Sequence, residues 1–219
     1  TSSFLVTAKL AGIAYILAVV LGVVVGVVAA VNHGKWVDSV LMTISVFGIS
    51  APAFWIAIIL QIVICLKFNL LPLSGIDSFK SFILPGIALG TRYAASIARI
   101  TRTSMLDVLS QDYIRTAEAK GLKGWVVTIK HALRNALIPI ITIAGSDLGN
   151  ILTGSVLVES VFSIPGIGKM LVDSINTRDL PIVQGGVMYI AVICVIMYLV
   201  VDLLYTVVDP RIRLGKESS

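Results

Sequence analysis

The sequence predicts an all-α membrane protein, because it is rich in apolar residues, poor in charge and organised into long apolar stretches. Hydrophobic residues form 57% of the 219 residues and charged residues only 13%, whereas about 25% of a typical soluble domain is charged. An α-helix needs roughly 17–25 residues to cross a bilayer. Five stretches nearly free of charge reach this length: residues 10–34, 39–66, 81–98, 135–158 and 180–208. We therefore expect five transmembrane helices, and not a secreted disulfide-built domain, a disordered chain or a solvent-facing enzyme.

The basic residues predict which side of the membrane each loop faces, since cytoplasmic loops carry an excess of Lys and Arg. Most of the 17 Lys and Arg follow the first, third and fifth stretches, including Arg211, Arg213 and Lys216 after the last one. The amino end of this chain is thus expected outside and the carboxyl end in the cytoplasm. Because the chain opens at Thr1 without a basic start, we also expect it to begin part-way through a longer protein.

Small residues and a proline predict how the apolar helices pack. Ala18, Gly22, Gly26 and Ala30 recur every fourth residue, and such a smooth face lets two helices approach closely. Pro52 removes a backbone donor inside the second stretch and is expected to kink it.

The cysteines and histidines carry no predicted metal or redox chemistry. Cys65 and Cys194 lie inside apolar stretches, where a thiol behaves as a small hydrophobe. The only two histidines, His33 and His131, lie in different loops. No metal site is visible in the sequence.

Residues 99–135 are too long and too patterned for a simple connector. Ser110 or Asp112 can cap a helix start by accepting free backbone amides, and Gly121 can end that helix in the left-handed conformation. A second helical stretch over residues 125–134 has an apolar face and a basic face. Two interpretations of these short helices stay open: an interfacial hairpin that binds anionic lipid, or a docking element for a cytoplasmic partner.

Several sequence blocks occur in an order that is typical of one family. They are residues 112–122 (DYIRTAEAKGL) continued by 131–139 (HALRNALIP), 159–168 (ESVFSIPGIG), 178–185 (RDLPIVQG), and 201–205 (VDLLY) with 209–213 (DPRIR). On these blocks the whole chain resembles the permease subunits of ATP-binding-cassette (ABC) importers, in the branch that carries di- and oligopeptides, glutathione and nickel. The resemblance implies a type I ABC importer permease fold.

The sequence departs from that family in two places. Arg115, Thr116 and Ala117 stand where importers generally have Glu-Ala-Ala, six residues before Gly121, and the peptide branch tolerates this form. Family members also have six spans, so the resemblance implies that the first one is missing here and that five remain.

The resemblance divides the chain by function. Residues 1–219 would form a single transmembrane permease domain, with a cytoplasmic coupling segment at 99–135 and an external loop at 159–181. A coupling helix would sit in a groove of an ATPase and pass the closure of that ATPase to the membrane helices. Nine residues would carry this contact, with polar side chains around the small surface of two alanines: Arg115, Thr116, Ala117, Glu118, Ala119, Lys120, Gly121, Leu122 and Lys123.

The resemblance implies a transport subunit and not an enzyme. The sequence has no phosphate-binding loop of the form GxxxxGK[ST], and the nearest stretch, residues 166–170, lacks the leading glycine and the hydroxyl residue. No cofactor would be bound by this chain, and ATP and Mg²⁺ would be held by partner subunits. The implied partners are two ABC ATPase subunits, a second homologous permease, an extracytoplasmic substrate-binding protein and membrane lipid, without nucleic acid. The implied location is the cytoplasmic (inner) membrane of a bacterium or archaeon.

Di- or oligopeptides are the substrates that the resemblance implies first. A nickel or metal-chelate importer and a glutathione importer are alternatives in the same branch, because substrate choice rests largely with the binding protein. Outside the family, an ion-coupled secondary transporter would use Arg92 and Asp147 as its coupling pair, and a plain membrane anchor would use neither. The patterned segment at 99–135 argues against both.

Two ionisable residues lie inside predicted spans, where a charge is costly and indicates a functional site. At a rise of 1.5 Å per residue, Arg92 lies about 15 Å and Asp147 about 12 Å from the outer surface. They are predicted to form a buried ion pair that lines or gates a translocation path; direct contact with the charged ends of a peptide and a purely structural pair are the alternatives. Ser146, Asn150 and Thr153 fall within two turns of Asp147 and would share the path, unless they bond to their own or a neighbouring helix.

The loop before the last stretch predicts one more helix. Apolar residues recur at helical spacing within residues 163–179. We expect a short interfacial helix there, which would either dock a binding protein or only cap the bundle. Glu159 and Asp202 lie near opposite interfaces, where structural roles are expected.

Overall fold

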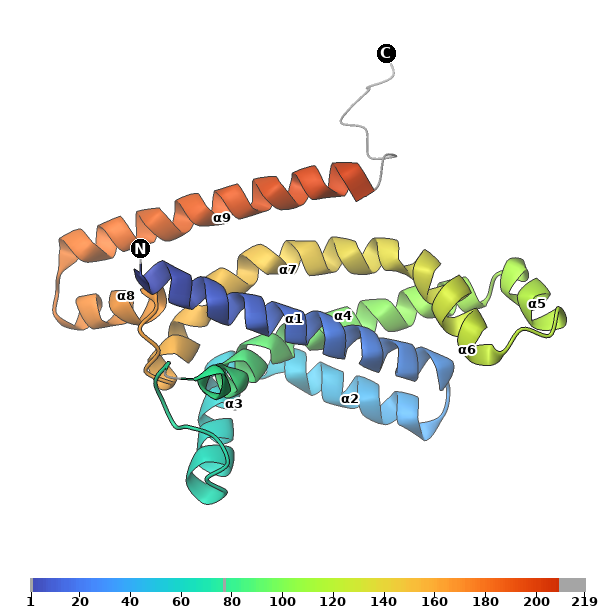
Figure 1. The fold of residues 1–219 in the computed structure, drawn as a ribbon, viewed down its shortest axis with the longest axis horizontal. Helices are drawn as coiled ribbons and strands as arrows, with labels where there is room; N and C mark the ends of the chain where they lie inside the picture. The colour runs from blue at the N-terminus through green and yellow to red at the C-terminus, as the bar shows by residue number, and fades with distance from the viewer. Residues whose placement is uncertain (1, 77, 209–219) are drawn as a thin grey trace, which may run out of the picture.

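The chain folds as a bundle of helices, with no strand in the residues that the structure describes, 2–76 and 78–208 (Figure 1). In this computed structural model the α-helices are joined by short 3₁₀ and π segments. The elements are α1 (Ser2–Val31), α2 (Trp36–Ser50), α3 (Ala53–Leu60), the π-helix η1 (Gln61–Lys67), the 3₁₀ turn η2 (Phe79–Phe82), α4 (Ile83–Leu109), α5 (Asp112–Ala119), α6 (Gly124–Val126), the π-helix η3 (Val127–Leu133), α7 (Arg134–Val161), α8 (Ile167–Asn176) and α9 (Leu180–Val208). The predicted all-α class is confirmed for these residues.

Close packing of α1 on α4 forms the centre of the bundle. The four small residues predicted to make a smooth face on α1 are all buried. A methyl group added to Gly22 would lie 2.7 Å from the Ala94 carbonyl oxygen, and one added to Gly26 would lie 2.4 Å from Thr101 Cβ. The absence of side chains at these two positions therefore sets how closely the helices approach.

The second predicted span is bent and does not run straight through residues 39–66. Helix α2 ends at Ser50, Ala51 and Pro52 are extended, and α3 with η1 leaves at 107° to α2. The kink expected at Pro52 is confirmed. It is larger than expected because both residues of the junction leave the helical conformation, so the pair forms a broken span or a re-entrant loop.

Three helical segments are long and apolar enough to cross a membrane: Ser2–Val31, Gly124–Val161 and Leu180–Val201. The bent pair of α2 with α3 and η1 makes a fourth if it counts as one span. Helix α4, which contains the third predicted span, is not among them. Several charged residues lie along it, while its apolar side packs against α1, α2, α3 and α7. The predicted count of five spans is thus not confirmed by length and composition.

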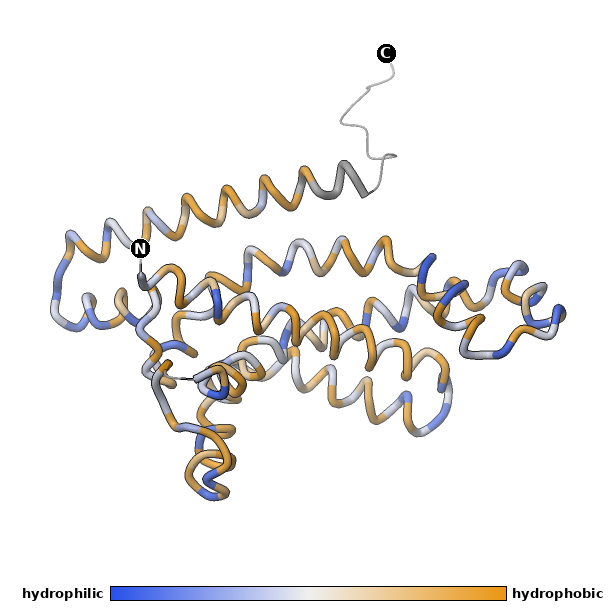
Figure 2. Tube along the Cα trace, in the orientation of Figure 1, coloured by the Kyte–Doolittle hydropathy of each residue, from blue (hydrophilic) through white to orange (hydrophobic). Residues whose placement is uncertain are grey.

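The buried side chains form two clusters, one toward each end of the bundle. One cluster includes Leu10, Phe82 and Phe162, and the other includes Met105 and Ile114. Figure 2 shows mainly apolar residues along α1 and α9, and polar residues gathered in the segments at the two ends of the bundle. Helix α9 runs along the outside of α7 with few of its side chains covered (Figure 1).

The helix predicted within residues 163–179 is present as α8. Pro181 lies in the first turn of α9, where the backbone N–H that proline lacks would have no partner within the helix. Helix α8 lies at the end of the bundle remote from α5 (Figure 1). The side chain of Asp202 and the basic residues Arg211, Arg213 and Lys216 lie outside the described part of the chain.

Candidate functional site

The predicted coupling helix is present as α5, and its end is built as expected. Gly121 has a φ of +78°, in the left-handed region. Its N–H donates to the Glu118 carbonyl at 2.9 Å, and the Leu122 N–H donates to the Ala117 carbonyl at 3.4 Å. This pair of bonds is a Schellman motif, which ends the helix sharply. At the other end the cap is Gln111, without a side-chain bond, so neither Ser110 nor Asp112 caps the helix as predicted.

One side of α5 is fixed to the bundle. Ile114 and Ala117 are buried and belong to the same cluster as Met105 and Val127. The Tyr113 hydroxyl also accepts a hydrogen bond from Asn135 Nδ2 at 3.0 Å. Ala117 therefore faces the core of this chain, and the prediction that it forms an outward contact surface with Ala119 is wrong.

The other side of α5 and its turn is open. Eight of the nine residues predicted to contact an ATPase are exposed: Arg115, Thr116, Glu118, Ala119, Lys120, Gly121, Leu122 and Lys123. Charges of both signs and one leucine form this outer face.

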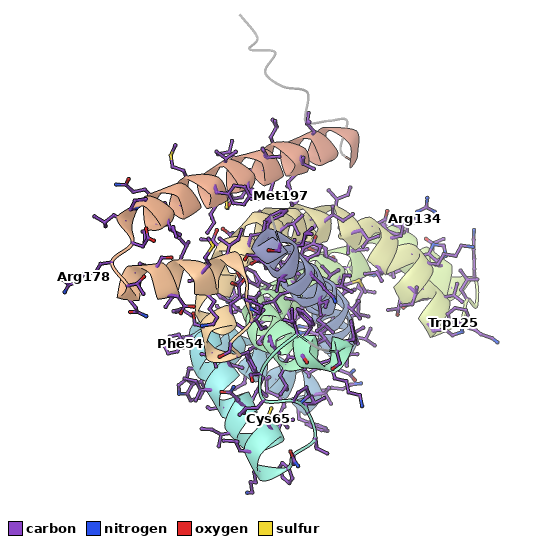
Figure 3. The ribbon with its side chains drawn as sticks, turned by 60° about the vertical axis from the view of Figure 1, so that its left-hand side comes forward. Phe54, Cys65, Trp125, Arg134, Arg178 and Met197 are labelled. Atoms are coloured by element: carbon purple, nitrogen blue, oxygen red, sulfur yellow. The ribbon has the colours of Figure 1, made fainter. Side chains whose placement is uncertain are left out.

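The second short helix predicted over residues 125–134 is not separate. Segments α6 and η3 continue into α7, so that Gly124–Val161 is one helical stretch of 38 residues. Trp125 and Ile129 are exposed on it, while Val127 and Ala132 are buried. Figure 3 shows Trp125 and Arg134 at the end of the molecule opposite Arg178. Helix α5 is consequently attached to a long helix through four residues, Lys120 to Lys123.

The two intramembrane charges lie on helices that pack together, Arg92 on α4 and Asp147 on α7. Arg92 is exposed and Asp147 is partly buried. No salt bridge of 4.0 Å or less joins them. The predicted ion pair is not formed in this structure. One carboxylate oxygen of Asp147, Oδ2, is buried and has no hydrogen-bond partner.

The other predicted path residues use their polar groups locally. Ser146 Oγ donates to the Ile143 carbonyl at 2.9 Å. Asn150 Oδ1 accepts a bond of 2.9 Å from the Tyr198 hydroxyl, and Thr153 Oγ1 lies 3.4 Å from Cys194 Sγ. All three are exposed to the surroundings of this chain. The hydrogen bond of Ser146 lies within α7, and the contacts of Asn150 and Thr153 are made with α9. These contacts match the alternative in which the three residues bond to their own or a neighbouring helix.

The described residues contain no group of three or more His, Cys, Asp or Glu side chains placed to hold a metal ion. Cys65 and Cys194 are free cysteines.

Comparison with known proteins settles the family. Residues 22–214 match the family model described as "Binding-protein-dependent transport system inner membrane component". The chain belongs to this family.

Relatives and solved structures agree with that assignment. The permease is 44% identical over 212 residues to the proteins named "Glutathione transport system permease protein GsiC" of Salmonella choleraesuis (strain SC-B67) and Escherichia coli (strain K12). The match covers 97% of this chain and 69% of each relative. The permease is therefore an inner-membrane subunit of an importer, and not an ion-coupled transporter or a plain anchor.

The fold is that of ABC transporter permeases. An inward-facing structure of the MetNI methionine ABC transporter matches with a TM-score of 0.76 at 15% identity, covering 95% of both chains. An amino acid ABC transporter crystallised with histidines matches with a TM-score of 0.71 at 16% identity, covering 93% of this chain and 91% of that one.

The structure explains one sequence block of the permease that the residues alone left open. Glu159 is completely buried and accepts bonds from the Ser155 hydroxyl at 2.9 Å and from the Lys169 N–H at 3.2 Å. The Thr7 hydroxyl of α1 accepts a bond of 2.9 Å from the Ile167 N–H. These two side chains satisfy free amides in the first turn of α8. They fix α8 to α7 and α1.

Glycines make this cap possible. A methyl group on Gly166 would lie 2.3 Å from Glu159 Oε2, and one on Gly168 would lie 2.4 Å from Val156 Cα. The structural role expected for Glu159 is therefore to cap the start of α8. The sequence block 159–168 contains both Glu159 and the two glycines that leave room for its carboxylate, Gly166 and Gly168. This block is the sequence signal for the cap.

A second group of charged residues in the permease was not predicted. Asp38, at the start of α2, is buried and accepts two bonds from Arg102 of α4. The Gly34 N–H donates to the same carboxylate at 3.2 Å, and His33 Nδ1 lies 3.1 Å from it. This cluster ties the α1–α2 loop to α4. The sequence gives only a weak signal for it, because the pair is 64 residues apart.

Proposed function

We propose that this permease forms one half of the translocation path of an ATP-driven importer for small peptides, glutathione among them. The observation that carries the proposal is the 44% identity, over 97% of the chain, to glutathione transport permeases. A second homologous permease supplies the other half of the path. A binding protein outside the membrane delivers the substrate, and two ATPase subunits bind ATP and Mg²⁺ and hydrolyse the nucleotide.

The coupling segment at 99–135 passes movement between the ATPases and the membrane helices. Three features of α5 support this role: it is anchored by Ile114 and Ala117, it ends in a fixed turn at Gly121, and it leads directly into the helix Gly124–Val161. A rigid connection of this kind transmits a rigid-body displacement, whereas a mobile loop absorbs it. The exposed side chains of Arg115, Glu118 and Lys120 contact the ATPase.

The permease crosses the inner membrane with α5 in the cytoplasm and α8 outside, so that its amino end is external and its carboxyl end cytoplasmic. We assign the five spans of a type I permease to α1, the bent pair of α2 and α3, α4, α7 and α9. The external loop at 159–181, with α8, receives the binding protein. Lipid covers the exposed apolar side chains of α9 on the side away from α7.

Arg92, Asp147, Ser146, Asn150 and Thr153 line the path on this proposal. Their support is their position, since they are polar groups on α4 and α7 that the rest of this chain leaves partly or fully uncovered. The path is completed by the second permease.

Two glycines at the coupling turn give a matched test. Gly121 needs a left-handed backbone, which proline cannot adopt, whereas Gly124 has no atom within 4 Å of an added methyl group and no positive φ. The complex is purified from native membrane in mild detergent, and the bound ATPase is measured. We expect Gly121→Pro to lose the ATPase subunits while it remains inserted in the membrane, and Gly124→Ala to keep them. A wild-type permease that retains no ATPase would refute the proposed function.

A further inference from the structure

A pocket of about 330 Å³ lies at the end of the bundle that holds α8. Three segments meet there: the start of α1 with Ser3, helix α8, and the turn into α9. Figure 1 places this end of the molecule opposite α5. The described residues that line the pocket include none of those assigned to the translocation path. The pocket is therefore a separate feature of the permease.

The walls of the pocket carry more negative than positive charge. Asp173 of α8 and Asp179 before α9 line it, and Lys169 is the one basic residue among its described lining residues. Lys169 Nζ pairs with the Asp173 carboxylate, 3.2 Å from Oδ1 and 3.0 Å from Oδ2. Arg178 does not line the pocket, and its side chain points away from the bundle (Figure 3). The carboxylate of Asp179 is thus left in excess.

The pocket also holds acceptor atoms that the described part of the chain leaves free. Asp179 Oδ1 accepts a bond of 3.3 Å from the Ile182 N–H and so caps α9, while Asp179 Oδ2 has no such partner. Ser174 lines the pocket and is only 7% exposed, yet its hydroxyl makes no hydrogen bond. A shielded hydroxyl without a partner is costly. Helix α8 also ends here, at Asn176, and the C-terminal end of a helix favours a cation.

We propose that this pocket receives a basic side chain, lysine or arginine, of the external binding protein when that protein docks. This assignment rests on the proposed function, which gives α8 to the binding protein, and it adds the chemistry of the contact. A cation with N–H donors matches the free carboxylate oxygen, the free hydroxyl and the helix end together, whereas an anionic or apolar side chain matches none of them. Met170 and Ile182, apolar and exposed at the pocket, exclude water from such a pair.

The first test asks which charge the pocket prefers. Thr177 is exposed and lines the pocket, while the neighbouring Asn176 is exposed and does not. Thr177→Cys and Asn176→Cys are introduced separately into the purified complex. Each is labelled with aminoethyl methanethiosulfonate, which carries an ammonium group like that of lysine, or with sulfonatoethyl methanethiosulfonate, an anion. The labelling rate of the wild type, which has Cys65 and Cys194, is subtracted.

We expect the ratio of cationic to anionic labelling rates to be about tenfold higher at position 177 than at position 176. Adding Asp179→Asn should remove most of that difference, because asparagine keeps an acceptor for the α9 cap and loses the charge. Equal ratios at the two positions, or a difference that Asp179→Asn leaves unchanged, would overturn the proposal.

The second test asks whether the occupant is the binding protein. The complex is reconstituted in vesicles and titrated with the binding protein that stimulates ATP hydrolysis by the wild type. Asp173→Asn with Asp179→Asn should raise the concentration for half-maximal stimulation about tenfold. Arg178→Gln, a change of one charge beside the pocket, should not raise it. The effect of the double variant should shrink at high salt, since salt screens exposed charges.

Three results of this titration would overturn the assignment. They are an unchanged half-maximal concentration in the double variant, an equal increase in Arg178→Gln, and an increase that salt does not affect, which indicates a purely structural role. The two proposals fail in different ways. A complex that the binding protein stimulates with no dependence on these charges refutes only the pocket. A permease that holds no ATPase, or that no binding protein stimulates, refutes the importer.

Discussion

Arg102 holds Asp38 with two parallel hydrogen bonds, Nε to Oδ1 at 2.6 Å and Nη2 to Oδ2 at 2.7 Å. The aspartate is almost fully buried and the arginine is 23% exposed at its side chain. This bidentate pair joins α2 to α4 at the end of the bundle that also holds α5 (Figure 1). It therefore fixes the α1–α2 hairpin to α4, the helix that precedes α5.

Removal of one partner should destabilise the permease strongly. Arg102→Met leaves the Asp38 carboxylate buried without its cation, which costs about 3 kcal/mol. The matched control is Lys169→Met, because Lys169 pairs with the exposed Asp173 and such pairs contribute less than about 1 kcal/mol. The free energy of unfolding is measured by denaturing-detergent titration of the purified protein. Equal losses of unfolding free energy in the two variants would contradict a stabilising role for the Asp38–Arg102 pair.

The buried carboxylate of Glu159 should hold α8 in place. Glu159→Ala leaves the Lys169 N–H and the Ser155 hydroxyl without this acceptor and opens a cavity, at a cost of about 2–3 kcal/mol. We expect faster hydrogen exchange over Ile167–Asn176 and unchanged exchange over α5. Asp173→Ala, at an exposed site on α8, is the control. Unchanged protection of α8 in Glu159→Ala would show that other contacts fix it.

The α1–α4 contact should tolerate no side chain at Gly22. A methyl group there lies 2.7 Å from the Ala94 carbonyl, whereas nothing lies within 4 Å of one at Gly12 on the same helix. Gly22→Ala should cost about 1–3 kcal/mol by overpacking. Gly12→Ala should be neutral or stabilising by up to about 1 kcal/mol, since alanine favours a helix over glycine. Thermal unfolding in detergent distinguishes them, and a destabilised Gly12→Ala with a stable Gly22→Ala would contradict the packing.

Replacement of either of two alanines of α5 by arginine should affect stability and ATPase binding in opposite ways. Ala117 is 7% exposed and lies in a buried cluster, while Ala119 faces outward. Ala117→Arg should lower the melting temperature, because its charge enters the core. Ala119→Arg should leave the melting temperature unchanged and reduce capture of the ATPase. Loss of ATPase binding without loss of stability in Ala117→Arg would reverse this assignment of inner and outer sides.

Local signals in the sequence were sufficient for much of this fold. The apolar stretches predict the long helices because burial in lipid or in a core needs continuous apolar surface. The repeat of small residues in α1 predicts a close contact with another helix, which the structure shows to be α4, and the glycine after residues 112–120 predicts a left-handed helix end. Each of these features depends on a few neighbouring residues, so pattern alone reveals it.

Features that depend on distant residues or on backbone geometry were missed. Pro52 predicted a kink within residues 39–66, but the size of the bend, 107°, depends on the extended backbone of Ala51 and Pro52, which hydropathy does not specify. The stretch over residues 125–134 was predicted as a separate short helix, yet it begins at Gly124 and continues into α7. The Asp38–Arg102 pair joins two helices whose contact no local pattern specifies. The predicted Arg92–Asp147 pair failed for the same reason, since equal depth does not fix lateral distance.

The helical stretch from Gly124 to Val161 connects the two ends of the molecule. At 1.5 Å per residue its 38 residues extend for about 57 Å. One end follows the Gly121 turn, and the other carries Glu159, whose carboxylate holds the start of α8. Movement of α5 can therefore be passed to the start of α8 through one continuous helical stretch. The wider π turns of η3 lie at the end of that stretch nearest to α5, and π turns within α-helices are frequent at functional sites.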